Sequence, residues 1–268
     1  MVTRPVLRYP GGKYVIATWV ISHFPQHETY VELFGGAASV LMRKSRSMGE
    51  VYNDLDDEVV NVFRVLRDRE SAKELTRLLQ LTPFAYSEYK EAYEYSDDPI
   101  ERARRMILRS FAGIGSDSVQ RKHAGFRGLK NNESGVTAAL EWSRYPAAIQ
   151  YFVERLQSVV IECRDATRLI NVYDREKTLF YIDPPYMMST RSTASVRYRY
   201  EMDDSEHKEL SNRLHEVKGM VVVSGYSSDL YDRLYAGWTK VEHSSKAQNG
   251  KHRVECLWLS PNIQTTLF

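Results

Sequence analysis

The stretch Thr178-Leu179-Phe180-Tyr181-Ile182-Asp183-Pro184-Pro185-Tyr186 joins a short, almost wholly apolar run to a carboxylate, two prolines and an aromatic ring. A run of this kind is typical of a strand buried on both faces of a parallel sheet. The polar residues then mark the carboxyl end of the strand, which is where α/β folds bind their ligands. The stretch therefore predicts an α/β fold with a functional site directly after this strand.

The four residues after the strand supply the groups that activate an amino group on a flat ring. The lone pair of the exocyclic amine of adenine is spread into the ring, so the amine becomes nucleophilic only when acceptors favour a more tetrahedral nitrogen. The Asp183 carboxylate and the Pro184 carbonyl are candidate acceptors, because proline fixes the backbone and has no amide hydrogen. Tyr186 is a candidate for stacking on the base. Taken alone, the tetrapeptide can also be read as a strand-ending turn with two prolines.

Two earlier segments have the small residues that let a ligand approach the backbone. Near the amino terminus, Gly11 and Gly12 stand between Tyr9 and Lys13. Residues 29–34 read as a second buried strand and run into the turn Gly35-Gly36-Ala37-Ala38-Ser39. This turn resembles the first βα turn of nucleotide-binding folds, although its spacing is not GxGxxG.

A third strand end supports a nucleotide site. Val51-Tyr52-Asn53-Asp54 places Asp54 about 20 residues after the glycines, which is the spacing at which such folds bind ribose hydroxyls. An acidic residue at this place is also a common helix cap, and both Asp54 and Asp56 fit that alternative.

Together these motifs resemble the Dam-like DNA adenine N6-methyltransferases, and the matches occur in the family's order. The matching segments are residues 9–13, 31–37, 53–54, 163–166, 183–186, 221–225 and 249–258. Several ordered matches are far more specific than one. The resemblance implies methyl transfer from S-adenosylmethionine to the N6 amine of adenine in DNA, after the base has been flipped out of the duplex.

The resemblance also implies the roles of individual residues. Asp183, Pro184 and Tyr186 would be catalytic. The cofactor-binding residues would be Tyr9, Lys13, Glu32, Phe34, Gly35, Asp54, Asp165, Ala166 and Asp183. The ribose would lie on Asp54 and the cofactor adenine near Asp165 and Ala166. No metal is expected, because the positively charged leaving group already supplies the electrophile.

Residues 57–157 nearly lack strand signals and are expected to form a helical insertion that recognises DNA, while residues 1–56 and 158–268 form the catalytic domain. The stretch 101–130 has a local net charge of +6, from eight basic and two acidic residues. At helical spacing, Arg102, Arg105 and Arg109 lie opposite an apolar stripe. They form either a solvated face or, since the positive charge of the stretch is largely uncompensated, a phosphate-binding face.

Other basic residues are expected to contact DNA as well. The full set is Arg102, Arg105, Arg109, Arg121, Lys122, Arg127, Arg191, Arg197 and Lys251. Residues 187–203 interleave arginines with tyrosines and fit either a cover over a flipped base or an ordinary surface loop. Residues 113–135 are expected to read the target, whose sequence stays open.

Composition limits the class of protein without identifying it. With 268 residues, of which 43% are hydrophobic, the chain can build one large α/β domain with a sizeable insertion. Cys163 and Cys256 are the only cysteines, so a reducing compartment is expected. The amino terminus has no apolar core of a signal peptide, and no stretch is long enough to span a membrane. We therefore expect a cytoplasmic protein, associated with the nucleoid of a bacterial or phage-infected cell. Its oligomeric state stays open, and a monomer is compatible with the sequence.

Two alternatives remain open from sequence. One is an amino-methyltransferase that acts on cytosine N4 or on RNA, because Asp183 favours adenine without excluding cytosine. The other is an inactive DNA-binding partner on the same fold. The presence of Lys13, Asp54 and Asp183 together argues against the second alternative.

Overall fold

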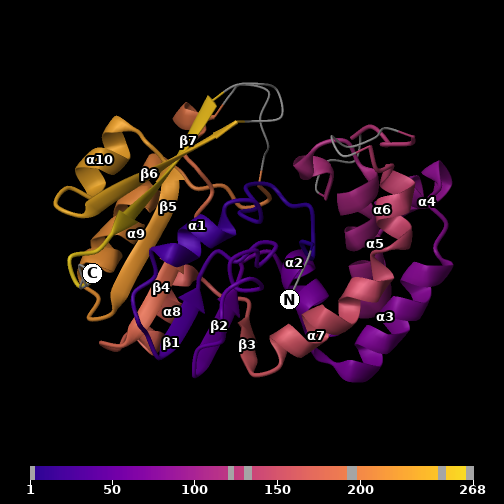
Figure 1. Ribbon diagram of the computed structural model, residues 1–268, viewed down its shortest axis with the longest axis horizontal. Coiled ribbons are helices and arrows are strands. Elements are labelled where there is room, and N and C mark those ends of the chain that lie inside the picture. The colour runs from indigo at the N-terminus through magenta and orange to yellow at the C-terminus, as the bar shows by residue number, and fades with distance from the viewer. Residues whose placement is uncertain (1–3, 120–123, 130–134, 192–197, 247–251, 264–268) are drawn as a thin grey trace.

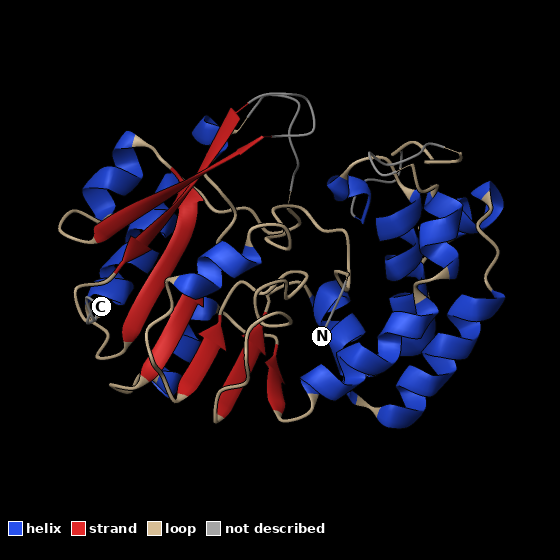
Figure 2. Ribbon diagram, viewed as in Figure 1, coloured by secondary structure: helices blue, strands red, loops and turns tan. Residues whose placement is uncertain are grey.

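A computed structural model describes residues 4–119, 124–129, 135–191, 198–246 and 252–263. The strands are β1 (Thr29–Glu32), β2 (Gly49–Asn53), β3 (Val159–Glu162), β4 (Thr178–Ile182), β5 (Met220–Tyr226), β6 (Thr239–Lys246) and β7 (His252–Leu259). They form one sheet in the order β3-β2-β1-β4-β5-β7-β6. The first five strands of this order run parallel, and β7 is antiparallel to β5 and β6. The expected mostly parallel α/β sheet is confirmed (Figure 2).

Helices cover both faces of the sheet (Figure 1). The α-helices are α1 (Ala17–Ser22), α2 (Asp57–Arg67), α3 (Arg69–Leu81), α4 (Tyr86–Glu91), α5 (Pro99–Ala112), α6 (Ala138–Ser143), α7 (Ile149–Leu156), α8 (Ala166–Tyr173), α9 (Asp204–His215) and α10 (Asp229–Leu234). Short 3-10 helices are η1 (Ser116–Val119), η2 (Pro146–Ala148) and η3 (Met188–Thr190). In the described residues, no helix has the length and apolar character needed to cross a membrane.

The alternation of side chains along the buried strands divides the core into two layers. In β4, Leu179 and Tyr181 belong to the core on one face, whereas Phe180 and Ile182 belong to the core on the other. This is the two-residue period of a strand, and here both faces are apolar. Helices α8, α9 and α10 pack on the layer that contains Phe180, and α1 and α2 pack on the opposite layer.

Helices α2 to α7 occupy the chain between β2 and β3, and they form the helical lobe at the right of Figure 1. Two of these helices show simple capping: the side chain of Asp56 accepts from the amide of Glu58 at α2, and Asp98 caps α5 directly before Pro99. The apolar residues of this lobe share one continuous core with the sheet. The ring of Phe63 on α2 packs against Tyr52 of β2, with centroids 4.3 Å apart.

The chain after β1 departs from a regular βα unit. The expected strand at 29–34 ends at Glu32, and residues 35–44 form successive turns in place of an α-helix. Gly36 and Ala38 have φ values of +46° and +51°, which a right-handed helix does not accommodate. The amide of Leu41 donates to the carboxylate of Glu32 at 3.0 Å and not to a helical carbonyl. The turn thus keeps the glycine motif open toward the carboxyl ends of the strands.

Candidate active site

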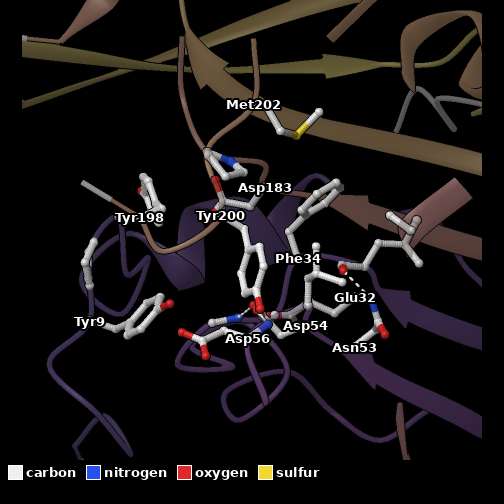
Figure 3. A pocket seen from close by; sticks show the side chains of 18 of the residues that line it. Tyr9, Glu32, Phe34, Asn53, Asp54, Asp56, Asp183, Tyr198, Tyr200 and Met202 are labelled. Carbon is white, nitrogen blue, oxygen red and sulfur yellow. Dashed lines mark hydrogen bonds between the residues drawn. The ribbon is translucent and has the colours of Figure 1, made fainter. Parts of the chain in front are cut away.

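A pocket of about 300 Å³ lies at the carboxyl ends of β1, β2 and β4. It is lined by the amino-terminal loop, the glycine turn, the ends of β2 and β3, the segment after β4, and residues 198–202. Figure 3 shows aromatic rings of Tyr9, Phe34, Tyr198 and Tyr200 around this space. Every residue that the sequence resemblance assigned to the cofactor lines the pocket, namely Tyr9, Lys13, Glu32, Phe34, Gly35, Asp54, Asp165, Ala166 and Asp183.

Asp54 holds the glycine turn through hydrogen bonds to two backbone amides. Gly36 N donates to Asp54 Oδ2 and Asp56 N donates to Oδ1, each at 2.8 Å. The alternative role of helix cap belongs to Asp56, whose Oδ1 accepts from Glu58 N at 3.1 Å. Burial raises the pKa of Asp54 to about 6, although its bonds to the amides oppose this rise.

Glu32 places a second carboxyl group on the pocket wall. It is only 2% exposed, and its Oε2 accepts from the hydroxyl of Tyr30 at 2.6 Å and from Leu41 N at 3.0 Å. Burial raises the pKa of Glu32 to about 8, against the opposing effect of these two donors. Both hydrogen bonds use the same oxygen, so Oε1 is the oxygen available to a ligand.

Asn53 joins the ends of β2 and β3 beside the pocket. Its Nδ2 donates to the carbonyls of Leu33 and Arg164, and its Oδ1 accepts from Arg164 N, all at 2.9 Å. This clamp fixes the start of α8, where Asp165 Oδ1 accepts from Thr167 N at 3.0 Å. The sequence resemblance included Asn53 only as the neighbour of Asp54. Asn53 is the last residue of a buried strand, and this position alone could have indicated its structural role.

The catalytic motif lies against Lys13. Lys13 Nζ forms an ion pair with Asp183 Oδ1 at 2.9 Å, donates to Gly11 O at 2.7 Å, and lies 4.6 Å from the ring centroid of Tyr186. Burial alone would lower the pKa of Lys13, but the carboxylates of Asp183 and Glu255 raise it above its usual value. Burial raises the pKa of Asp183, and the ammonium of Lys13 opposes this rise.

Tyr186 and Pro184 are buried beside the pocket but are not part of its lining. The hydroxyl of Tyr186 lies 2.9 Å from Glu255 Oε2 and 3.1 Å from Ser224 Oγ, and its ring meets the ring of Tyr226 edge to face. Asp183 and Tyr186 therefore flank Lys13 from two sides. Among the described residues, no cluster of three or more His, Cys, Asp or Glu side chains is arranged to hold a metal ion.

Residues 198–202 form part of the pocket wall. None of the sequence motifs predicts this position for them. Arg191 makes a two-pronged ion pair with Glu201, at 3.0 and 2.8 Å, and Tyr198 N donates to Glu201 Oε1 at 2.8 Å. Arg199 reaches Asp56 Oδ1 at 3.0 Å. Contacts of Arg191 and Arg199 thus attach the segment after the Asp183 motif to the rim of the pocket near Asp54.

The arginine row of α5 is not without acidic partners, and that expectation is wrong. Arg102 pairs with Asp57 and Glu58 of α2 at 2.9 and 2.6 Å. Arg105 pairs with Glu101 at 2.6 Å and lies 3.6 Å from Glu91. Arg109 lies 3.8 Å from Glu58 and over the ring of Tyr93. The local count of charge missed these partners because α2 and α4 bring most of them from elsewhere in the chain.

Other basic residues assigned to DNA are also paired where the structure describes them. Arg127 lies 3.0 Å from Glu141, and Arg191 is held by Glu201 with a side chain only 8% exposed. Arg121, Lys122, Arg197 and Lys251 lie outside the described residues. DNA contact by any of these side chains remains a prediction.

Comparisons with known proteins agree with this geometry. The DNA adenine methylase of Escherichia coli strain K12 is 22% identical over 269 residues, covering 93% of this chain and 92% of that protein. The DNA adenine methylase of Salmonella typhi is 21% identical over 247 residues, with coverage of 87% and 84%. That of Vibrio cholerae serotype O1 strain N16961 is 21% identical over 245 residues, with coverage of 87% and 85%.

A family profile matches most of the chain, from residue 9 to residue 249. The match includes the amino-terminal loop, the glycine turn, the helical lobe and the Asp183 motif. The chain therefore belongs to the family of D12 class N6 adenine-specific DNA methyltransferases.

Proposed function

We propose that this enzyme, which methylates adenine N6 in DNA as its family does, takes the methyl group from S-adenosylmethionine bound in the pocket at β1, β2 and β4. The observation that carries the proposal is that nine residues from separate segments, all implied by the sequence resemblance, line one pocket. Two of them, Lys13 and Asp183, form an ion pair in its wall. The pocket volume of about 300 Å³ lies within the range of small-molecule sites.

The donors and acceptors around the pocket fit the three parts of this cofactor. Asp54 offers carboxylate oxygens to the ribose hydroxyls. Asp165 offers an acceptor to the adenine amine, and the amide of Ala166 has no carbonyl partner within α8, because it belongs to the first turn. Glu32 Oε1 offers a negative charge to the cationic methionyl end, and a cation there would lower the raised pKa of Glu32.

The bound cofactor would supply a methyl group on a sulfonium, so that the N–C bond forms as the S–C bond breaks, a neutral thioether leaves and the methylated amine releases one proton to water. The protein has to make the adenine amine nucleophilic. Asp183 and the carbonyl of Pro184 accept its two hydrogens, which favours the tetrahedral nitrogen of the transition state. Lys13 favours the ionised form of Asp183 and opposes the effect of burial, because its ammonium lies 2.9 Å away. Tyr186 supplies the ring on which the flipped base stacks.

DNA is proposed to approach from the side of the molecule on which the strands end. Residues 113–119 and 124–129 lie on that side of the helical lobe, and strands β6 and β7 extend on the same side of the sheet (Figure 1). Gly113 and Phe126 form an isolated antiparallel bridge, so this segment folds back on itself and projects from the end of α5. Helices α2 to α7 would serve as the DNA-recognition insertion, with residues 113–135 reading the target.

Substitution of Asp183 tests the mechanism. Asp183→Ala removes the acceptor of the reacting amine, and one such contact contributes roughly 3 kcal/mol or more, which corresponds to at least about a hundredfold in kcat. The assay is transfer of labelled methyl groups to adenine N6 at saturating cofactor. Thermal unfolding and duplex binding serve as controls for an intact fold. A variant with activity within about threefold of the wild type would remove Asp183 from the mechanism.

A further inference from the structure

We infer that Glu255 is a positioning residue for adenine methylation, which acts by fixing the ring of Tyr186 through its hydroxyl group. The inference rests on the proposed role of Tyr186 as the stacking partner of the flipped base. Glu255 lies on β7, 69 residues beyond Tyr186 in the sequence. Its carboxylate reaches the hydroxyl of Tyr186 from the last hairpin of the fold.

The contacts around Tyr186 hold its hydroxyl at one place. Tyr186 Oη donates to Glu255 Oε2 at 2.9 Å and lies 3.1 Å from Ser224 Oγ, which can act as donor or acceptor. The tyrosine is 6% exposed. A buried hydroxyl without an acceptor is costly, and a carboxylate is a stronger acceptor than a neutral group. Glu255 therefore fixes the far end of the ring, while the backbone of the motif fixes the near end.

The pairing of β5 and β7 puts these groups together. Residue 226 on β5 lies opposite Glu255 on β7 in the antiparallel register, and the ring of Tyr226 meets that of Tyr186 edge to face, with centroids 4.6 Å apart and planes 75° apart. Edge-to-face packing constrains the rotation of a ring about its own axis. With the hydroxyl held by Glu255 and one edge held by Tyr226, the plane of Tyr186 is determined before a base arrives.

The charge of Glu255 also reaches the ion pair. Its carboxylate raises the pKa of Lys13, and the same negative charge raises the pKa of Asp183. Loss of this charge would therefore change the reaction by a second route, through Lys13 and Asp183. The direct effect of this charge persists without the hydroxyl of Tyr186, whereas positioning requires that hydroxyl. The hydroxyl of Tyr186 also lowers the pKa of Asp183, so kcat is compared on the pH plateau of each variant.

A double-mutant cycle separates the routes. Glu255→Gln and Glu255→Ala are made in the wild type and in Tyr186→Phe, which keeps the ring and lacks the hydroxyl. In the wild type, Glu255→Gln should lower kcat by about fivefold to tenfold, because the amide oxygen of glutamine is a weaker acceptor than a carboxylate. In Tyr186→Phe, the same substitution should change kcat by less than about twofold. Glu255→Asp should restore part of the activity.

A spectroscopic readout and a matched control complete the design. With 2-aminopurine at the target position of a duplex that the enzyme methylates, fluorescence should be higher for Glu255→Gln than for the wild type, because stacking on Tyr186 is looser. Glu242→Gln on β6 is the control, since Glu242 belongs to the same hairpin and pairs with Lys240 at 3.4 Å. It should leave both kcat and fluorescence unchanged.

Two results would overturn the inference. Equal losses of kcat from Glu255→Gln in both backgrounds would show that Glu255 acts through Lys13 and Asp183, and unchanged kcat in the wild type would show that it does not position Tyr186. Failure of the proposed stacking role looks different. In that case Tyr186→Ala itself would retain wild-type kcat and 2-aminopurine fluorescence, whatever residue stands at position 255.

Discussion

Replacement of Lys13 by methionine should move the pH dependence of methylation to higher pH. Burial already raises the pKa of Asp183, and the ammonium of Lys13 at 2.9 Å opposes that rise. At an effective dielectric constant of about 20, two unit charges at this separation interact by roughly 6 kcal/mol. Water entering the vacated space would screen much of this energy. A remainder of only about 1.4 kcal/mol still corresponds to one pKa unit.

The sign follows from the form of Asp183 that reacts. In the proposed mechanism the ionised carboxylate accepts the amine hydrogens, so activity is lost as pH falls through its pKa. Without Lys13 that pKa rises further, so the acid limb of kcat should shift to higher pH by at least about one unit.

The measurement is kcat against pH at saturating cofactor and DNA, because Lys13 also lines the pocket proposed for the cofactor. Lys13→Arg is the matched control, since it keeps the positive charge and should keep the acid limb near its wild-type position. If Lys13→Met is slower at every pH by the same factor, with an unmoved acid limb, then Lys13 does not control the ionisation of Asp183.

Two further predictions concern cofactor binding and the helical lobe. Because Asp54 has a pKa of about 6, affinity for S-adenosylmethionine should fall as pH is lowered through 6, and calorimetry of Asp54→Asn should show weaker binding without this pH dependence. A wild-type affinity that is flat between pH 5 and 7 would contradict the role of Asp54. Replacing the three paired arginines of α5 by glutamine should lower the free energy of unfolding, because Glu58 and its neighbours lose their partners. Retained stability together with a flatter salt dependence of DNA binding would instead return these arginines to the phosphate backbone.

The parts of the site that sequence predicts well are those in which one short segment carries both the fold and the chemistry. Residues 178–186 encode a strand by their apolar run and a ligand site by the residues that follow it. Asp54 directly follows β2, and Asp165 lies three residues after the end of β3, a strand that pairs in parallel with β2, so their meeting at one edge follows from the fold class.

The parts that sequence misses depend on contacts between distant segments. The arginines of α5 read as unpaired because their acidic partners on α2 lie about 44 residues earlier in the chain. Glu255 reaches Tyr186 only through the antiparallel pairing of β7 with β5. Arg199 reaches Asp56 across 143 residues. No periodicity or local motif predicts these contacts, since they arise from tertiary packing.

The contact between Tyr52 and Phe63 sets a limit on how members of this fold can be recombined. A Cβ atom on Gly35 would lie 2.2 Å from the ring of Tyr52, and Tyr52 Oη donates to Gly36 O at 2.8 Å, so the glycine turn rests directly on this ring. The ring rests in turn on Phe63 of α2. A chimera that exchanges the helical lobe to change the DNA target should therefore keep α2 with its own sheet and make the junction after Arg67. A junction at residue 57 would place a foreign helix beneath Tyr52 and the glycine turn.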